Sequence, residues 1–380
     1  YRPETPDPVI PKGKIDPSAK RPLSVRAESK ADVAQALDLA KSYGFTELWV
    51  ETNRPEVLVA ATSGPLPVRL VLRPWRVSPP SQGGDQTILG ETGSVVARRI
   101  AASPLWQSAA SGWRMQTYPR WPALSPPGDV LSPFDPAWPS RSNALLALAR
   151  TPKLAGIVVA DSIVHGYEQV DDHGQVGSYS RKLVEMWAMG YLPEARLAFI
   201  RAKGADPIDL VSQGMRVDVD LDPMFFRDTY EGPGTSFPTE YSLFEDWMKF
   251  RNAENVRAIK ALLAGLPNVP VLVDLRPESI TQPLRRYVPL VPWTPGGEFV
   301  TYHDQFPPEL PNGVALLVAP DPRNVGPFDD IANVARASLP NPKAPIALDL
   351  SSLPASAWAS FLMRVLDRPS SSSVHANGLQ

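Results

Sequence analysis

The chain has 380 residues, of which 43% are apolar and 21% are charged. Its formal net charge of −2 at pH 7 leaves no basic surplus to neutralise a phosphate backbone, so we expect no nucleic-acid partner. There is no cysteine, which excludes disulfides and cysteine nucleophiles, and no apolar run is long enough to span a bilayer. This composition is typical of a globular protein that buries a sizeable core.

The two ends of the chain differ in composition from the region between them. Residues 1–20 are rich in proline and predict an extended arm, whereas residues 369–380 are rich in serine and predict a flexible tail. Either end could contact a protein partner. The chain begins at Tyr1, for which removal of a secretory signal is one explanation and trimming another. We therefore expect a secreted or periplasmic protein whose main domain spans residues 21–368.

Helix and strand patterns alternate along this domain. Residues 29–44 predict a helix, because Ser29 and Asp32 have the spacing of a capping box, apolar residues recur at helical spacing and Gly44 ends the pattern. Short apolar runs typical of strands buried on both faces lie at 46–52, 68–75, 154–161, 268–275, 313–320 and 344–350. Further helical patterns lie at 143–150, 192–204, 243–265, 328–339 and 354–366.

This alternation predicts parallel strands joined by helical crossovers. No G-x-G-x-x-G follows the first strand and no G-x-x-x-x-G-K-[ST] occurs, so the usual phosphate-binding loops of open sheets are missing. We therefore favour an α/β fold of the (β/α)8 TIM-barrel type, with long proline-rich βα loops, over an open doubly wound sheet. The two strands still needed are sought at 112–118 and at 288–293 or 298–303. The long segment 162–246 is predicted to be an insertion that folds over the barrel mouth.

Several of the predicted strands end in a polar residue, at the rim where catalytic groups of such barrels stand. These residues are Glu51, Arg73, Asp161, Asp274, Asp321 and Asp349. Two carboxylates at one rim can supply the acid and base, or the acid and nucleophile, of glycoside cleavage. Aspartate also caps helices and forms turns, and we favour that role for Asp321 and Asp349. The predicted catalytic residues are Asp161 and, as its partner, Asp274 or Glu51, one of the pair being held neutral by its surroundings.

Tryptophan and tyrosine are frequent in the proline-rich loops, which favours a carbohydrate ligand. An indole face can stack on a pyranose ring while Arg and Asp side chains bond the hydroxyls. Packing of tryptophan on proline is the alternative role for most of these residues. His165 lies near two aspartates in "HGYEQVDDH", but no third ligand can be assigned, so we predict neither a metal nor a cofactor. The predicted substrate-binding residues are Arg73, Trp75, His165, Tyr167 and Trp293.

Three segments, roughly the middle third of the chain, resemble known proteins. "SPFDPAWPSRSNALLALARTPKLAGIVVADSIVHGYE", "MGYLPEARLAFIRAKGADPIDL" and "FEDWMKFRNAENVRAIKALL" are similar to bacterial glycosyl-hydrolase-like (β/α)8 proteins of the family-10 glycosidase type. The resemblance implies that Asp161 is the strand-end aspartate of that group and Tyr167 its loop tyrosine. Ala160 stands where the group has the first of two aspartates, and no Asn-Glu pair ends this strand. We expect a glycoside hydrolase acting on a poly- or oligosaccharide; the alternative is a non-catalytic barrel that binds carbohydrate or serves in assembly.

Overall fold

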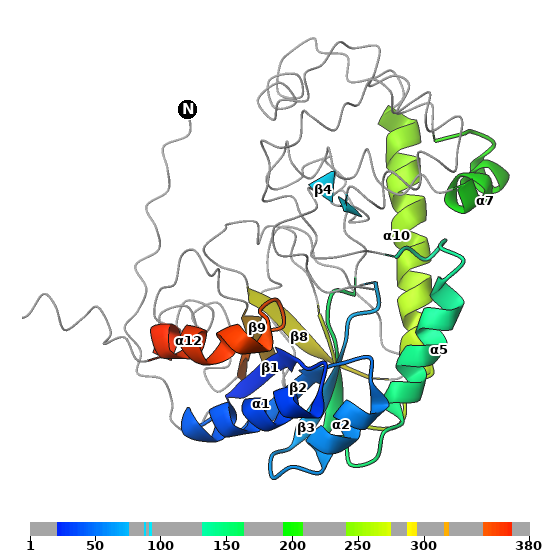
Figure 1. The fold of residues 1–380 in the computed structure, drawn as a ribbon. Coiled ribbons are helices and arrows are strands. Elements are labelled where there is room, and N and C mark those ends of the chain that lie inside the picture. The colour runs from blue at the N-terminus through cyan, green and yellow to red at the C-terminus, as the bar shows by residue number, and fades with distance from the viewer. Residues whose placement is uncertain are drawn as a thin grey trace, which may run out of the picture.

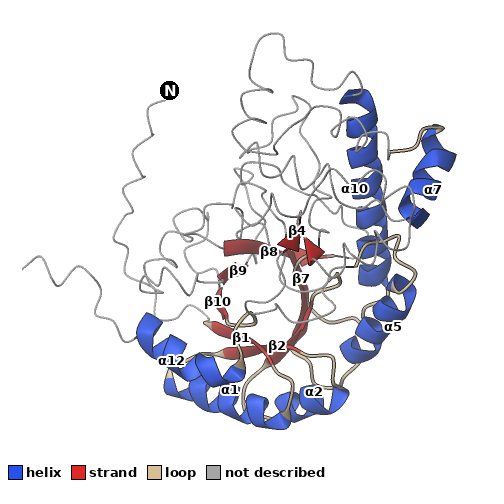
Figure 2. Cartoon of the chain, turned by 45° about the horizontal axis from the view of Figure 1, so that its top comes forward, coloured by secondary structure: helices blue, strands red, loops and turns tan. Residues whose placement is uncertain are grey.

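A computed structural model of the chain describes residues 21–75, 87–88, 91–92, 131–162, 193–207, 241–274, 287–294, 315–318 and 345–366. Within these ranges the fold is α/β, with a ring of strands inside and helices around it (Figures 1 and 2). The strands are β1 (Pro22–Arg26), β2 (Glu47–Glu51), β3 (Val68–Leu72), β4 (Thr87–Ile88), β5 (Glu91–Thr92), β6 (Gly156–Val159), β7 (Val271–Asp274), β8 (Tyr287–Trp293), β9 (Ala315–Val318) and β10 (Ile346–Asp349). The helices are α1 (Lys30–Ser42), α2 (Pro55–Thr62), α5 (Trp138–Ala149), α7 (Pro193–Lys203), α10 (Tyr241–Ala264) and α12 (Ala355–Leu366).

The barrel closes through hydrogen-bonded neighbours in the order β1-β10-β9-β8-β7-β6-β3-β2, while β4 and β5 form a separate antiparallel pair. From β9 through β10, β1, β2, β3 and β6 to β7, every neighbouring pair is parallel. Strand β8 completes the ring and is antiparallel to both β7 and β9. The predicted α/β fold with a curled, mostly parallel sheet is therefore confirmed, and the expectation that all strands are parallel is wrong.

The sequence of the segment before β8 is consistent with the antiparallel direction of this strand. Strand β8 occupies the predicted candidate 288–293, and its register pairs Asp274 with Leu290. It therefore starts at the end of the barrel where β7 finishes. A parallel strand needs a crossover to the other end, usually through a helix, and segment 275–286 contains Pro277 and Pro283, which disfavour one. The other predicted elements at 112–118, 298–303 and 328–339, together with residues 1–20 and 369–380, lie outside the described residues.

Two elements of the barrel were not predicted from sequence. Strand β1 has Leu23 and Val25 buried outward against the helices, while Ser24 between them breaks the apolar run. Strand β1 forms nonetheless, because its backbone is paired with β2 on one side and β10 on the other. Helix α2 begins at Pro55, whose fixed φ suits the first turn of a helix, and it packs beside α1 (Figure 2).

Helix α1 confirms its predicted start. The hydroxyl of Ser29 accepts a hydrogen bond from the backbone N–H of Asp32 at 3.2 Å, and the Asp32 carboxylate accepts from the backbone N–H of Ser29 at 3.0 Å. This reciprocal capping box satisfies two backbone donors that have no partner inside the helix. Buried Val33, Ala36 and Ala40 then hold one face of the helix on the barrel.

Replacing Ser29 with alanine should lower the free energy of unfolding by about 1 kcal/mol, because the cap acceptor is lost while the chain keeps its fold. Urea unfolding of the two proteins measures the change. Ser360→Ala is the matched control, since the Ser360 hydroxyl is exposed on α12 and bonds only the carbonyl of Ala357 in the described structure. That control should change stability by less than about 0.5 kcal/mol. Equal losses in both variants would contradict a capping role for Ser29.

The barrel interior is layered. Outward-facing side chains such as Leu48 and Val50 pack against the helices, whereas Trp49, Val71 and Val158 fill the middle of the barrel. Beneath this apolar layer, at the start of β2, Glu47 Oε2 accepts hydrogen bonds from Arg69 Nε and from Trp49 Nε1, both at 3.2 Å. The apolar layer separates these residues from the charged residues at the opposite rim.

Helices α7 and α10 form a unit beside the barrel (Figure 1). Phe199 of α7 packs edge-on against Trp247 and Phe250 of α10, at ring-centroid distances of 5.1 and 5.3 Å. Lys203 Nζ also pairs with Asp246 at 3.1 Å. Helix α7, which lies within the predicted insertion 162–246, is thus held against α10. The later half of α10 packs on the barrel through Ile259 and Leu262.

Candidate functional site

A group of charged side chains lies at the end of the barrel where the parallel strands finish. Glu51 ends β2, Asp274 ends β7 and Asp349 ends β10, while Arg73 directly follows β3 and Asp161 lies two residues after the end of β6. The structure thus brings Glu51, Arg73, Asp161 and Asp274 to the same rim, where the sequence predicted them together. In barrels of parallel strands this rim carries the functional groups.

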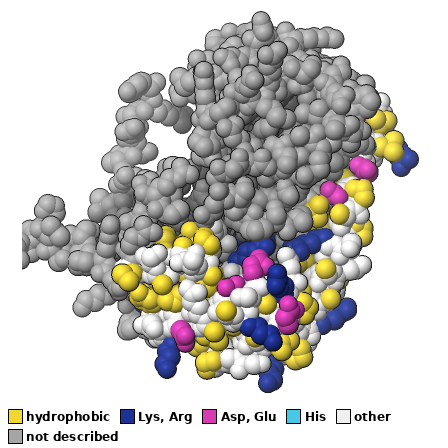
Figure 3. Space-filling model, in the orientation of Figure 1, with side chains coloured by type: hydrophobic (Ala, Val, Ile, Leu, Met, Phe, Trp, Pro, Cys, Tyr) yellow, Lys and Arg dark blue, Asp and Glu magenta, His cyan; other side chains and the backbone are white. Residues whose placement is uncertain are grey.

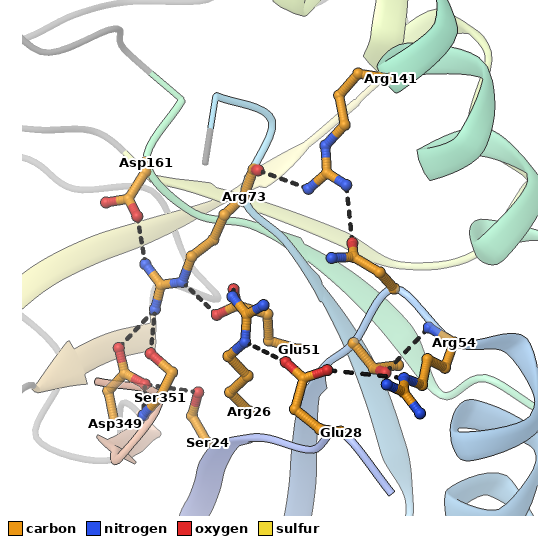
Figure 4. Close-up of polar contacts among 12 residues, drawn as sticks. Ser24, Arg26, Glu28, Glu51, Arg54, Arg73, Arg141, Asp161, Asp349 and Ser351 are labelled. Atoms are coloured by element: carbon orange, nitrogen blue, oxygen red, sulfur yellow. Dashed lines mark hydrogen bonds and ion pairs between the residues drawn. The ribbon is translucent and has the colours of Figure 1, made fainter. Parts of the chain in front are cut away.

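Arg73 is the centre of this rim and is only 4% exposed (Figure 4). Its Nε donates to Glu51 Oε2 at 2.8 Å, its Nη1 to Asp161 Oδ2 at 2.6 Å and its Nη2 to Asp349 Oδ2 at 2.6 Å. Nη2 also donates to the hydroxyl of Ser351 at 3.0 Å. One guanidinium therefore joins carboxylates from three other strands. The planar fork of arginine is suited to such multiple pairing, which a lysine cannot reproduce.

The partners of Arg73 are themselves held by further hydrogen bonds. Arg26 Nη1, at the end of β1, donates to Glu51 Oε1 at 3.0 Å, so this carboxylate lies between two arginines. Asp349 Oδ1 accepts from the hydroxyl of Ser24 and from the backbone N–H of Ser351, both at 3.0 Å. These contacts fix the orientation of the carboxylates before any ligand binds.

The electrostatics of Arg73 follow from this arrangement. Burial alone lowers its pKa, but the charges of Asp161, Asp349 and Glu51 outweigh burial, and the pKa of Arg73 lies well above the usual arginine value. Arg73 is therefore a permanent cation. On the face shown in Figure 3, acidic and basic side chains likewise lie side by side rather than in patches of one sign.

A second arginine, Arg141 of α5, lies above Arg73 in Figure 4. Its Nη1 donates to Asn53 Oδ1 at 2.8 Å and its Nη2 to the backbone carbonyl of Arg73 at 3.4 Å. Burial lowers the pKa of Arg141, and the charge of Arg26 adds to this effect while that of Glu51 opposes it. Through this bond Arg141 links α5 to the backbone of Arg73.

Asp161 differs from the other two carboxylates on Arg73 in exposure and backbone. Its side chain is 24% exposed, against 9% for Glu51 and 6% for Asp349. Its φ of 52° lies in the left-handed region, which few residues other than glycine occupy, although aspartate and asparagine do so more often than most. Where such a conformation occurs at a functional site, surrounding contacts maintain it. Asp161 is the carboxylate on Arg73 that a ligand at the rim can reach most readily.

Asp274 has a different environment from Asp161. It is buried, and its Oδ1 accepts a hydrogen bond from the backbone N–H of Ser162 at 2.9 Å. The Ser162 hydroxyl returns a bond to the carbonyl of Asp274 at 3.1 Å. These contacts join the end of β7 to the residue after Asp161, which gives Asp274 a role in holding the rim together.

The predicted substrate-binding residues separate into four groups. Arg73 lies at the centre of the rim. Trp75 is 2% exposed and packs on Trp138 at a ring-centroid distance of 4.2 Å, so its indole is covered and the described contacts give it a packing role rather than the predicted stacking on a sugar. Trp293 pairs with Val271 at the start of β7, at the opposite end of the barrel, because β8 is antiparallel. His165 and Tyr167 lie outside the described residues.

Sequence reasoning missed several members of the rim. Asp349 was interpreted as a cap or turn residue; its Oδ1 does accept the backbone N–H of Ser351, and its Oδ2, which that interpretation did not use, pairs with Arg73. The sequence did contain a signal for this role, because Asp349 stands near the end of the apolar run 344–350, as Asp274 does in the run 268–275. Arg26 and Ser24 were missed because β1 itself was not predicted. Asp321 lies outside the described residues.

Comparisons with protein-family models, curated proteins and solved structures gave no match to this chain. No helix in the described part of the chain combines the length and apolarity that a membrane span needs. The described ranges also hold no group of three or more histidine or acidic side chains placed to bind a metal ion. What the rim offers a ligand is therefore a partly exposed carboxylate beside a fixed, buried guanidinium.

Proposed function

We propose that this chain is a glycoside-hydrolase-like variant of the (β/α)8 barrel that acts on a poly- or oligosaccharide at the rim around Arg73. The observation that carries the proposal is Asp161: a strained, partly exposed carboxylate at a strand end, held by an arginine that also contacts two other strands. Strain and exposure at this rim favour a functional role over a turn role.

The contacts of each carboxylate favour particular roles. A carboxylate in contact with arginine is stabilised in its charged form, which suits a nucleophile or a stabiliser of an oxocarbenium-like transition state. Asp161 fits that role. Glu51 pairs with both Arg26 and Arg73, so we assign it to positioning Arg73. Asp274, buried and bonded to Ser162, is the predicted partner that we assign to protonating the leaving oxygen in glycoside cleavage.

The substrate class follows from the kinds of hydrogen-bonding groups at the rim. The carboxylate of Asp161, the most exposed of those on Arg73, accepts hydrogen bonds. A ligand dense in hydroxyl groups supplies donors for it.

A second candidate function has its own supporting observation. Arg73 already pairs with Glu51, Asp161 and Asp349, so the same network can serve to lock β2, β3, β6 and β10 together. In that case the barrel is a non-catalytic module that binds carbohydrate or serves in assembly. The two candidates differ in whether Asp161 is needed for turnover or only for binding.

The experiment is a screen of plant, fungal and bacterial-wall polysaccharides for release of reducing ends and for binding by the wild-type chain, followed by Asp161→Asn on every hit. Asparagine keeps the size of the side chain and tolerates the left-handed backbone, so folding should survive. Loss of an ionised catalytic carboxylate should lower turnover by about 10²-fold or more. Thermal unfolding checks that the variant is folded.

Asp38→Asn on the exposed face of α1 is the matched control and should leave turnover unchanged. Turnover that survives in Asp161→Asn would contradict the catalytic assignment. Binding that depends on Asp161, without turnover by the wild type, would support the second candidate. If the wild type neither binds nor cleaves any polysaccharide of the panel, the carbohydrate proposal itself is overturned.

A further inference from the structure

Four hydrogen bonds converge on Ser162, the residue that follows Asp161. Its backbone N–H donates to Asp274 Oδ1 at 2.9 Å, and its hydroxyl donates to the carbonyl of Asp274 at 3.1 Å. Its own carbonyl accepts from Trp75 Nε1 at 2.9 Å and from Asn255 Nδ2 at 3.2 Å. The donors and acceptors come from the loop after β3, from the end of β7 and from α10.

All of these groups are buried. Ser162 and Asn255 are fully covered, and Trp75 and Asp274 are almost so. A hydrogen bond in such surroundings is costly to leave unmade, because the donor or acceptor cannot turn to water instead. The peptide groups on both sides of Ser162 are therefore held firmly in place. Asp161 lies between this fixed point and the guanidinium of Arg73.

We propose that Trp75 and Asn255 are positioning residues that, through the carbonyl of Ser162, hold Asp161 in its left-handed conformation against Arg73. The role rests on the proposed function only in taking Asp161 as the functional carboxylate. Trp75, which the sequence predicted to stack on a sugar, would instead act in the same site by donating a hydrogen bond to the carbonyl of Ser162. Asn255 extends the support to α10, a helix that contributes none of the rim carboxylates.

The physical argument is that a strained backbone needs contacts at both ends. Arg73 holds the carboxylate of Asp161 at 2.6 Å, and the bonds to Ser162 hold the chain beyond it. If the carbonyl of Ser162 loses a donor, the backbone at Asp161 can relax toward an ordinary φ. The carboxylate then moves relative to the guanidinium, and its charged form is less well stabilised.

The test measures the Asp161 carboxyl directly, in the full chain and without a sugar. Carbon-13 NMR records the pH titration of the side-chain carboxyls, and the Asp161 signal is assigned by its disappearance in Asp161→Asn. Trp75→Phe removes the indole donor but keeps a ring against Trp138, and Asn255→Ala removes the second donor. Each variant should move the titration midpoint of Asp161 upward, because the pair with Arg73 weakens.

Leu262→Ala is the matched control, because Leu262 is buried in the core on α10, seven positions after Asn255, and its side chain has no hydrogen-bonding group. It should lower the melting temperature at least as much as Trp75→Phe and leave the Asp161 midpoint where it is in the wild type. An unchanged midpoint in Trp75→Phe, or an equal upward shift in Leu262→Ala, would overturn the positioning role. If Asn255→Ala does not fold, Trp75→Phe decides alone. The result is independent of the polysaccharide screen, so the two proposals can fail separately.

Discussion

Replacing Arg73 with methionine should lower the free energy of unfolding by about 3–5 kcal/mol at pH 7, the largest effect that we expect of any single substitution at the rim. Glu51 and Asp349 are almost completely buried and would lose a partner at 2.8 and 2.6 Å, respectively. Removing one member of a buried ion network leaves the opposite charges desolvated and uncompensated. Asp161, the most exposed of the three carboxylates on Arg73, would lose less.

The deficit of Arg73→Met should depend on pH in a definite direction. Without the cation, the remaining carboxylates are buried charges that lack their partner, and protonation in acid removes those charges. The loss of stability caused by the substitution should therefore shrink as the pH falls into the range where carboxyls take up protons. In the wild type the pKa of Arg73 is itself raised, so its contribution is complete below the ordinary arginine pKa and is lost only at more alkaline pH.

Urea unfolding of wild type and variant at pH 7 and at about pH 5 measures both effects, the lower value lying just above the usual carboxyl pKa. Arg73→Lys should be intermediate, since it keeps the charge but not the fork that reaches several carboxylates. Arg257→Met is the control, because Arg257 pairs with Glu254 on α10 with its side chain 70% exposed, and it should cost less than about 1 kcal/mol. A variant Arg73→Met as stable as wild type, or one with a larger deficit in acid, would refute the interpretation.

Gly156→Ala should destabilise the barrel by about 3 kcal/mol, the upper part of the range for overpacking a core. A Cβ at this position of β6 would lie 2.5 Å from Arg69 Nη1 and 2.6 Å from the backbone carbonyl of Pro270. The arginine end can shift, but the carbonyl belongs to the neighbouring chain segment and accepts the N–H of Ile157 at 2.9 Å. The strands would have to separate to admit one methyl group.

Thermal and urea unfolding measure this change, and two further variants identify its cause. Gly204→Ala has open space around the new methyl and a φ of 74°, so it reports the backbone cost alone, about 1 kcal/mol. Arg69→Ala combined with Gly156→Ala should not restore stability, because the clash with Pro270 remains. Full rescue by Arg69→Ala, or equal losses at Gly156 and Gly204, would show that the contact with Pro270 is not the cause.

Local patterns predicted most of the regular elements. The capping box at Ser29, the apolar runs and the helical spacing of α10 and α12 are properties of neighbouring residues, so they can be seen without a fold. The run at 288–293 likewise indicated a strand. Its direction depended on whether segment 275–286 crosses the barrel, and that is decided by how the chain packs rather than by the run itself.

The sequence by itself determined that acidic residues end buried strands and therefore meet at one rim, because parallel strands place their carboxyl ends together. Only the tertiary structure decided which of them share a partner. Arg73 pairs with Asp161 and Asp349, which lie 88 and 276 positions away, over distances of 2.6 Å. A hydrogen bond requires that precision in space, and periodicity along the chain contains no information about it. For the same reason, the burial of Trp75 and the hydrogen bond from Asn255 of α10 to the carbonyl of Ser162 became visible only once the strands and helices were in place.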